Sequence, residues 1–422
     1  MKYWGKIMAL IILTAVLLLS IAGCAEEADG SGMNIPEPDQ EILDAFDTAL
    51  ANASNELGFE LYRNLVTSED NLMISPTSIY TALAMTINGA GGETLEAMAD
   101  VLGIGSESLE RFNQNNLARL YKLQEADPDV VINIANSLWM KEGEDFDPDF
   151  VDRNQRYYNA SARALDFATE ESVDVINSWV SDRTDGLIEN IVEYPIDPQT
   201  ILFLINAVYF QGDWTEPFDV ERTSNDLFNG PEGEIPDVPF MNRNDEFAYL
   251  EKEGAFQAVR LPYGESERLA MVVFLPDEDS SLLEFAADLS TEKWNEWREE
   301  FQTYQGNLRL PRFSMEYEES LNDVLKLMGM EVAFDPATSD FYGMVTRNEG
   351  PRLYISEVKH KSFIEVDEKG TEAAAVTSVE IRVESAMMDF FEMNVNRPFF
   401  FLIHDRETNE VLFTGSVVDP TQ

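Results

Sequence analysis

The spacing of apolar residues changes along the chain from a helical period to a strand period. From Glu41, the sequence EILDAFDTALANASNELGFELYRNLV has apolar residues at helical spacing, which predicts one long helix. The next segment, 71–94, begins with a short apolar strand and then enters a helix at Ser75-Pro76, since proline is tolerated in the first helical turn. Further helices are predicted at 93–102, 107–124, 147–158 and 171–183.

Strands dominate the second half of the chain. The apolar runs that predict them are 130–140, 200–210, 256–263, 269–276, 308–316, 352–366, 399–405 and 410–418. Helices that come first and strands that follow are typical of an α+β fold, and they argue against alternating βαβ units. No linker rich in Pro, Gly or Ser follows residue 41 and no internal repeat is present, so one large domain is expected.

One stretch with a strand period, EKGTEAAAVTSVEIRVES (368–385), is unusually poor in large side chains. Small or apolar residues occupy alternate positions: Thr371, Ala373, Ala375, Thr377, Val379, Ile381 and Val383. Most residues between them are polar, and only Ala374 and Val376 break the pattern. Such alternation is typical of a half-buried strand, because successive side chains point to opposite faces. The pattern alone leaves three possibilities open: a strand, a linker, or a segment that becomes a strand later.

The charge balance is strongly acidic. The chain has 79 acidic and 29 basic residues, for a formal net charge of −50. A nucleic-acid partner is therefore excluded, because binding phosphates requires a basic patch. Repulsion between so many carboxylates destabilises a compact state unless salt screens it. We expect a halophilic protein whose stability rises with salt, with an ordinary, heavily solvated surface as the alternative.

The N-terminus has the features of a secretory signal. Lys2 and Lys6 precede the apolar run IMALIILTAVLLLSIA, which predicts a signal peptide over 1–23. The sequence IAGC that ends at Cys24 resembles a lipobox, so we expect Cys24 to carry a lipid that anchors the protein to the outer face of the cell membrane. An uncleaved anchor helix and ordinary secretion are the alternatives. Residues 24–40 are acidic, contain Gly and Pro, and suit a flexible tether.

Catalytic chemistry finds little support in the sequence. Neither histidine lies in a GxSxG, HExxH or HxE context, and the chain has no Gly-rich phosphate loop and no CxxC pair. We expect no enzyme activity, no cofactor and no metal. His360 falls within a predicted strand and is expected in the core, whereas His404 lies near the predicted turn HDRETNEV and is expected at the surface.

Several separate motifs, in order and spacing, resemble the serpin family of serine protease inhibitors from about residue 41 to the end. The motifs are NLMISPTSIYTALAMTINGAGGET (71–94), NAVYFQGDW (206–214), EKGTEAAA (368–375), MNVNRPFFFLI (393–403) and EVLFTGSVVDP (410–420). One departure is Gln211, where the family usually has Lys. The resemblance implies a monomer with a serpin fold over 41–422, in which about nine helices surround three β-sheets.

The resemblance also implies a function as a suicide inhibitor of serine endopeptidases, with cysteine endopeptidases as a second class of target. A target serine protease would cleave an exposed reactive-centre loop, about 368–396, and be trapped covalently as the loop inserts into the central sheet. The family's spacing places the cleaved bond at Glu384–Ser385. Arg382 is the main rival for trypsin-like enzymes, and Met387 or Met388 for others. The alternative function is that of a non-inhibitory serpin acting as a carrier, chaperone or storage protein.

The same resemblance assigns residues to three parts of the insertion machinery. The loop hinge comprises Glu368, Gly370, Thr371, Glu372, Ala373, Ala374 and Ala375. The sheet-opening cluster, a set of hydrogen-bonded side chains beneath the central sheet, comprises Ser75, Ser78, Asn206 and His360. The top of the sheet would carry Trp214 and an ion pair between Arg312 and Glu368, for which an exposed pair contributing little is the alternative.

Overall fold

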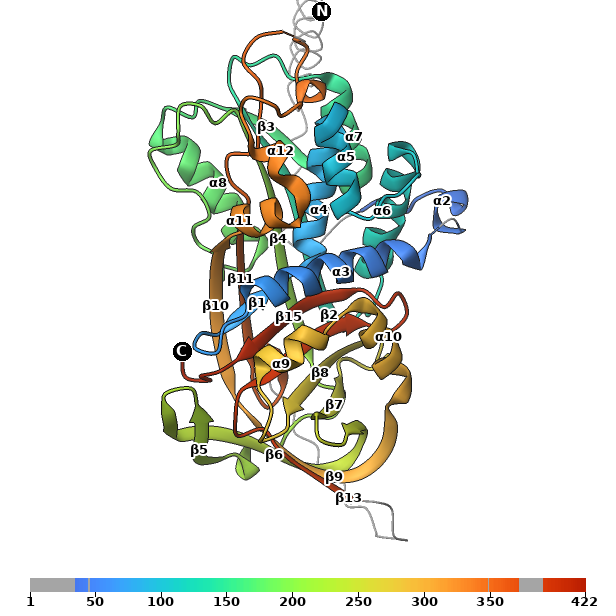
Figure 1. Cartoon of the computed structure of the whole chain (residues 1–422), viewed down its shortest axis with the longest axis vertical. Helices are drawn as coiled ribbons and strands as arrows, with labels where there is room; N and C mark the ends of the chain where they lie inside the picture. Colours follow the sequence, from blue (N-terminus) through green and yellow to red (C-terminus); the bar gives the residue numbers. More distant parts are fainter. Residues whose placement is uncertain (1–34, 45, 348, 372–389) are drawn as a thin grey trace, which may run out of the picture. The chain divides into compact units, whose positions relative to one another are not determined.

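A computed structural model describes residues 35–44, 46–347, 349–371 and 390–422 (Figure 1). Several predictions therefore fall outside the described residues: the signal peptide, the lipid attachment at Cys24, the hinge from Glu372 to Ala375, and the loop positions Arg382, Glu384, Ser385, Met387 and Met388. No helix in the described part of the chain is both long and apolar enough to cross a membrane.

The predicted helices are present, with one correction. The single helix expected from Glu41 is two helices, because the side chain of Asp47 accepts a hydrogen bond from the backbone N–H of Ala49 and starts a new helix. Ser75 caps α4 in the same way, and Pro76 is its first residue, as predicted. The helices are α2 Gln40–Asp44, α3 Thr48–Leu65, α4 Pro76–Thr86, α5 Gly92–Val101, α6 Leu109–Gln124, α7 Pro148–Tyr158, α8 Glu170–Arg183, α9 Leu282–Asp288, α10 Thr291–Glu300, α11 Asn322–Leu325 and α12 Glu331–Phe334.

A six-stranded sheet positions the predicted hinge. Its strands run in the order β10-β11-β12-β4-β2-β3. Their bounds are β2 Val130–Lys141, β3 Ser161–Leu165, β4 Leu202–Asp213, β10 Phe313–Ser320, β11 Lys359–Val366 and β12 Gly370–Thr371. The two-residue strand β12 thus lies between β11 and β4, two strands that are far apart in sequence.

A nine-stranded network forms the other sheet structure, in the order β1-β15-β14-β8-β7-β6-β9-β13, with β5 also on β6. The bounds are β1 Leu72–Ile74, β5 Ser224–Gly230, β6 Gly233–Lys252, β7 Phe256–Pro262, β8 Leu269–Pro276, β9 Gln302–Pro311, β13 Phe390–Asn394, β14 Phe399–Asp405 and β15 Val411–Val417. Three sheets were expected. Hydrogen bonds among the described residues join them into two networks, because the 20-residue β6 pairs with β5 and β9 and also, at its C-terminal end, with β7.

Two predicted strands have different bounds. The strand expected at 308–316 is interrupted at Arg312, whose backbone N–H bonds to Pro239 O, so the chain leaves one sheet with β9 and enters the other with β10. The strand expected at 352–366 begins only at Lys359. The remaining predicted strands and the α+β class are confirmed.

The core has two parts. A large apolar cluster contains buried side chains of the helices and of both sheets, among them Ile132 of β2, Phe210 of β4 and Ile364 of β11. A separate, smaller cluster holds α8 against β2 and β4, through residues that include Trp139, Ile176, Val180 and Ile205. Because the two clusters are separate, α8 is fastened to its face of the six-stranded sheet by its own set of contacts.

Candidate functional site at the opening of the six-stranded sheet

The first hinge residues already lie inside the sheet. Thr371 pairs with Val366 of β11 on one side and with Gly212 of β4 on the other. Its side chain is 3% exposed, and its hydroxyl lies 2.9 Å from the Tyr263 hydroxyl. A Cβ atom at Gly370 would overlap the backbone oxygen of Gly212, so only glycine allows this close approach.

Beyond β12, the sheet is open. In the described part of the chain, no ladder joins β4 directly to β11. A cavity of about 570 Å³ lies there instead, lined by residues of α4, β4, the start of β11 and the preceding segment 352–358. This cavity explains why the predicted strand at 352–366 begins late: the residues before Lys359 border a gap and have no strand to pair with.

The four residues of the predicted sheet-opening cluster lie together beside this cavity. The backbone N–H of Ser75 donates to Nε2 of His360 at 3.1 Å, and the Ser75 hydroxyl donates to Leu412 O at 2.7 Å. The Ser78 hydroxyl donates to Oδ1 of Asn206. The bond from His360 thus reaches the backbone of Ser75, the residue that caps α4.

Asn136 belongs to this cluster but was not predicted. The side-chain amide of Asn206 donates to Oδ1 of Asn136 at 2.6 Å, and Asn136 in turn donates to the backbone oxygen of Tyr158 at 2.7 Å. These bonds extend the cluster from α4 and β4 to β2 and α7. Asn136 and Asn206 face each other in the β2–β4 ladder, and that register cannot be read from two separate apolar runs.

Both histidines are buried, which corrects the prediction for His404. His360 is 5% exposed, as expected, and burial lowers its pKa to about 4. His404 is only 2% exposed and packs edge-on against Trp294, at 4.8 Å between ring centroids. It was placed near a turn, but β14 continues through Asp405, so the turn begins two residues after the histidine.

We expect His360→Ala to lower the free energy of unfolding by about 1–3 kcal/mol, because the buried N–H of Ser75 loses its acceptor. The wild type should also lose stability as the pH falls from about 6.5 to about 4, since the unfolded chain takes up a proton on His360 before the folded chain does. Melting temperatures measured across this range should fall less steeply in the variant. An unchanged acid slope would show that His360 does not titrate in this way.

At the top of the sheet, Glu368 makes two side-chain hydrogen bonds. Its carboxylate accepts from Nη2 of Arg312 at 2.5 Å and from the Thr223 hydroxyl. Glu368 is 2% exposed, so this is not a fully exposed ion pair. Burial raises the pKa of Glu368, but the hydrogen bonds from Arg312 and Thr223 outweigh burial and hold that pKa below its ordinary value.

Trp214 fixes the backbone that leads into the hinge. Its indole Nε1 donates to Asp367 O at 3.0 Å, and its backbone N–H donates to Lys369 O at 2.6 Å. The indole stacks on Tyr263, at 4.4 Å between ring centroids. Tyr263 was not predicted as a site residue, although it contacts both Trp214 and Thr371, because a single Tyr at the end of a predicted strand gave no signal.

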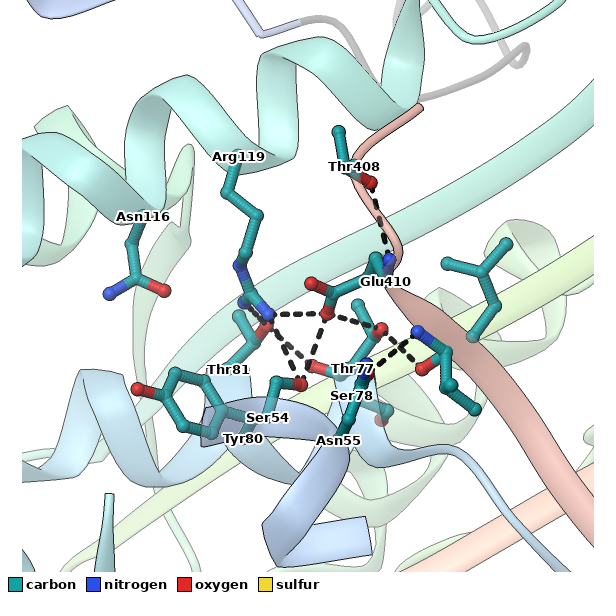
Figure 2. Close-up of polar contacts among 12 residues, drawn as sticks. Ser54, Asn55, Thr77, Ser78, Tyr80, Thr81, Asn116, Arg119, Thr408 and Glu410 are labelled. Carbon is teal, nitrogen blue, oxygen red and sulfur yellow. Dashed lines mark hydrogen bonds and ion pairs between the residues drawn. The ribbon is translucent and has the colours of Figure 1, made fainter. Parts of the chain in front are cut away.

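A buried ion pair lies next to the sheet-opening cluster (Figure 2). Arg119 of α6 donates to Glu410 at 2.7 Å and to the Thr81 hydroxyl at 2.8 Å. Glu410 also accepts from Thr77 at 2.8 Å and from Ser54 at 3.0 Å, and the side chains of the ion pair are fully buried. The pair therefore ties α4 to α3, to α6 and to the start of β15. Among 108 charged residues, the sequence gave no reason to single out these two.

Comparison with known proteins supports the assignment. Residues 52–420 match the family described as Serpin (serine protease inhibitor). An uncharacterized serpin-like protein of Thermococcus kodakarensis is 33% identical, over 97% of this chain and 98% of its own length. Human antithrombin-III is 32% identical, over 94% of this chain and 86% of its own length.

Solved structures of serpins resemble this chain over most of its length. The thermophilic serpin tengpin in its native state has 34% identity and a TM-score of 0.81, over 92% of this chain and 97% of its own. Human thyroxine-binding globulin, solved with its hormone, has 26% identity and a TM-score of 0.80, over 90% of this chain and 100% of its own. The α+β fold thus has counterparts among solved structures. The chain belongs to the serpin family.

Proposed function

We propose that the protein is a suicide inhibitor of serine endopeptidases, acting through a cleaved loop that inserts into the six-stranded sheet. The observation that carries this proposal is the position of Thr371, which is paired between β11 and β4 at one end of an open sheet. A cavity of about 570 Å³ lies toward the other end of the same two strands, lined by residues 202–206 of β4 and by Lys359 and His360 of β11. A strand that followed β12 would find both neighbours already in place.

The sequence after Thr371 suits such a strand. Its inward positions begin with Ala373 and Ala375 and end with Val379, Ile381 and Val383, so small side chains would enter first. Insertion would add on the order of ten backbone hydrogen bonds at roughly 1 kcal/mol each. Burial of the three branched side chains would add roughly 1.5–3 kcal/mol apiece. The sum is comparable with the stability of a whole domain, which is enough to displace an attached protease.

The proposed cleavage site is Glu384–Ser385, with Arg382 as the rival. This assignment rests on the number of residues that separate the bond from Glu368. Glu368 itself is held at the top of the sheet by its hydrogen bond from Arg312. A glutamate at this position favours a protease with a basic primary specificity pocket. A subtilisin-like enzyme of broad specificity would instead bind Ile381 and Val383 in apolar subsites.

Incubation with a panel of serine and cysteine endopeptidases tests the proposal. We expect a covalent complex that survives SDS with at least one serine endopeptidase, together with a C-terminal fragment that begins at Ser385. Thyroxine-binding globulin, a structural neighbour, is named for the thyroxine that it binds, so a carrier, chaperone or storage role is the alternative. Loop cleavage by every enzyme without any trapped complex would favour that alternative.

The proposal includes a lipid anchor at Cys24. With the signal removed, the mature chain would begin at this cysteine and carry enough acyl chains for stable membrane attachment. We expect mass spectrometry of the membrane fraction to find a lipidated N-terminal peptide that starts at Cys24. A mature protein that retains residues 1–23, or a soluble one that starts elsewhere, would contradict the anchor.

A further inference from the structure

The triplet Asn-Ala-Ser occurs twice in the sequence, at 52–54 and at 159–161. Asn-x-Ser is the acceptor motif for N-linked sugars in secreted proteins, and a triplet that carries a sugar lies on a surface loop. A motif this short also arises by chance, so its surroundings in the folded chain decide whether a bulky sugar can be attached there. The two copies differ sharply in this respect.

The first copy lies within α3 and faces other elements of the fold. The Ser54 hydroxyl is fully buried and donates to Glu410 at 3.0 Å (Figure 2). The side-chain oxygen of Asn52 accepts from Asn295 of α10 at 3.3 Å and from Asn409 at 3.4 Å. A sugar on Asn52 would have to separate α3 from α10 and from the segment before β15. This copy is therefore excluded as an acceptor in the folded protein.

The second copy lies where α7 ends and β3 begins. Asn159 and Ser161 are both exposed. Asn159 ends α7 in the left-handed region, at φ 49° and ψ 35°, a conformation that asparagine tolerates better than most residues. β3 is the last strand of the six-stranded sheet and pairs with β2, and no strand in the described ranges lies along its other side. A sugar on Asn159 could therefore extend into solvent without displacing a helix or a strand.

The charge around the second copy also differs from that of the whole chain. Residues 153–165 contain three arginines and no Asp or Glu, although the formal net charge of the chain is −50. Arg156 and Arg163 are exposed, and Arg163 lies on the same face of β3 as Ser161, because residues two apart in a strand point the same way. The donor of an N-linked sugar is a lipid phosphate, an anion that a strongly acidic surface repels. The two exposed arginines favour its approach at this place.

We propose that Asn159 is a site of N-linked glycosylation, with a lipid-phosphate-linked oligosaccharide as the sugar donor. In this reaction the side-chain nitrogen of Asn159 bonds to the anomeric carbon of the sugar, and the bond from that carbon to the phosphate oxygen breaks. The phosphate leaves with the electron pair, and the nitrogen gives up one proton to a base of the transferase. The inference rests on the proposed function in one respect, the export of the chain, because the motif is used in secreted proteins.

The test uses the full-length protein isolated from the cells that normally make it, with variants produced in the same cells. Trypsin cleaves after Arg156 and Arg163 and so releases residues 157–163, YYNASAR, as one peptide for mass spectrometry. We expect this peptide to carry added sugar masses that are lost in Ser161→Ala and retained in Ser161→Thr, which keeps the motif. Asn159→Asp should lose them as well, because it removes the acceptor nitrogen, and aspartate tolerates the left-handed conformation.

The peptide that contains Asn52 is the internal control and should carry no sugar in any of these proteins. An unmodified Asn159 in the wild type would overturn the proposal, and the N-terminus of the same sample would show whether export had failed too. A mature chain that begins at Cys24 with an unmodified Asn159 would leave the proposed export and the proposed inhibition intact. Sugar that persists in Asn159→Asp would be attached to a hydroxyl of the same peptide, and that result would also overturn the proposal.

Discussion

Replacing Thr371 with Arg is expected to turn the protein from an inhibitor into a substrate. Thr371 is seated between β11 and β4 with its hydroxyl 2.9 Å from that of Tyr263, so an arginine there would bury a cation without a partner. At several kcal/mol per unpaired ion, loop insertion should slow by at least about a hundredfold. The protease would then hydrolyse its acyl-enzyme and leave before it could be trapped.

The measurement is the number of inhibitor molecules cleaved for each protease molecule trapped. Thr371→Ser is the matched control, because it keeps the hydroxyl that faces Tyr263 and should trap normally. A companion variant, Glu384→Arg, should keep trapping and shift it toward trypsin-like enzymes if Glu384–Ser385 is the cleaved bond. Wild-type trapping by Thr371→Arg would mean that loop insertion is not the mechanism.

The second large effect is expected at the buried ion pair. Glu410→Ala would leave the guanidinium of Arg119 without its carboxylate in a fully buried position, at a cost of about 3–5 kcal/mol in the free energy of unfolding. Arg119→Met should lower the free energy of unfolding by a similar amount, because it leaves the buried carboxylate of Glu410 without its guanidinium. The double variant Arg119→Met with Glu410→Met should recover most of this loss, because no charge is then left alone.

Denaturant unfolding of the wild type, the two single variants and the double variant forms a thermodynamic cycle. The surface pair Lys293–Glu296, 3.0 Å apart, provides the control, and its removal should change stability by less than about 1 kcal/mol. Additive losses at Arg119 and Glu410 would show that the two charges are stabilised separately by their hydroxyl neighbours. In that case the pair would not join α6 to β15.

The sequence predicted those elements whose burial pattern is regular or whose ends carry a clear signal. Strands such as β8, buried at every position, and helices such as α7, with a proline at its start, were read correctly. The strand β6 was missed because it contains proline and charged residues and is partly exposed along much of its 20 residues. The helix α10, TEKWNEWREE, was missed because only Thr291, Trp294 and Trp297 of its ten residues are buried.

Of the site, the sequence predicted only those residues that belong to a family motif. Ser75, Ser78, Asn206 and His360 were assigned by resemblance, and the structure places them together. Asn136 and Tyr263 were not found, because their roles depend on strand register and on ring stacking between distant segments. The hydrogen bond from the backbone N–H of Ser75 to His360 could not be predicted either, because a motif of side chains does not specify which backbone groups need an acceptor.

The two-residue strand β12 has a consequence for the kinetics of the proposed insertion. Bringing a free loop into register between two strands carries an entropic cost before any hydrogen bond compensates for it. In this protein Gly370 and Thr371 have already met that cost, since both are paired with β4 in the uncleaved chain. Insertion would therefore lengthen a strand that is already paired, with each added residue hydrogen-bonding to β4 and β11 in turn, and its slow step would not be the first entry of the loop into the sheet.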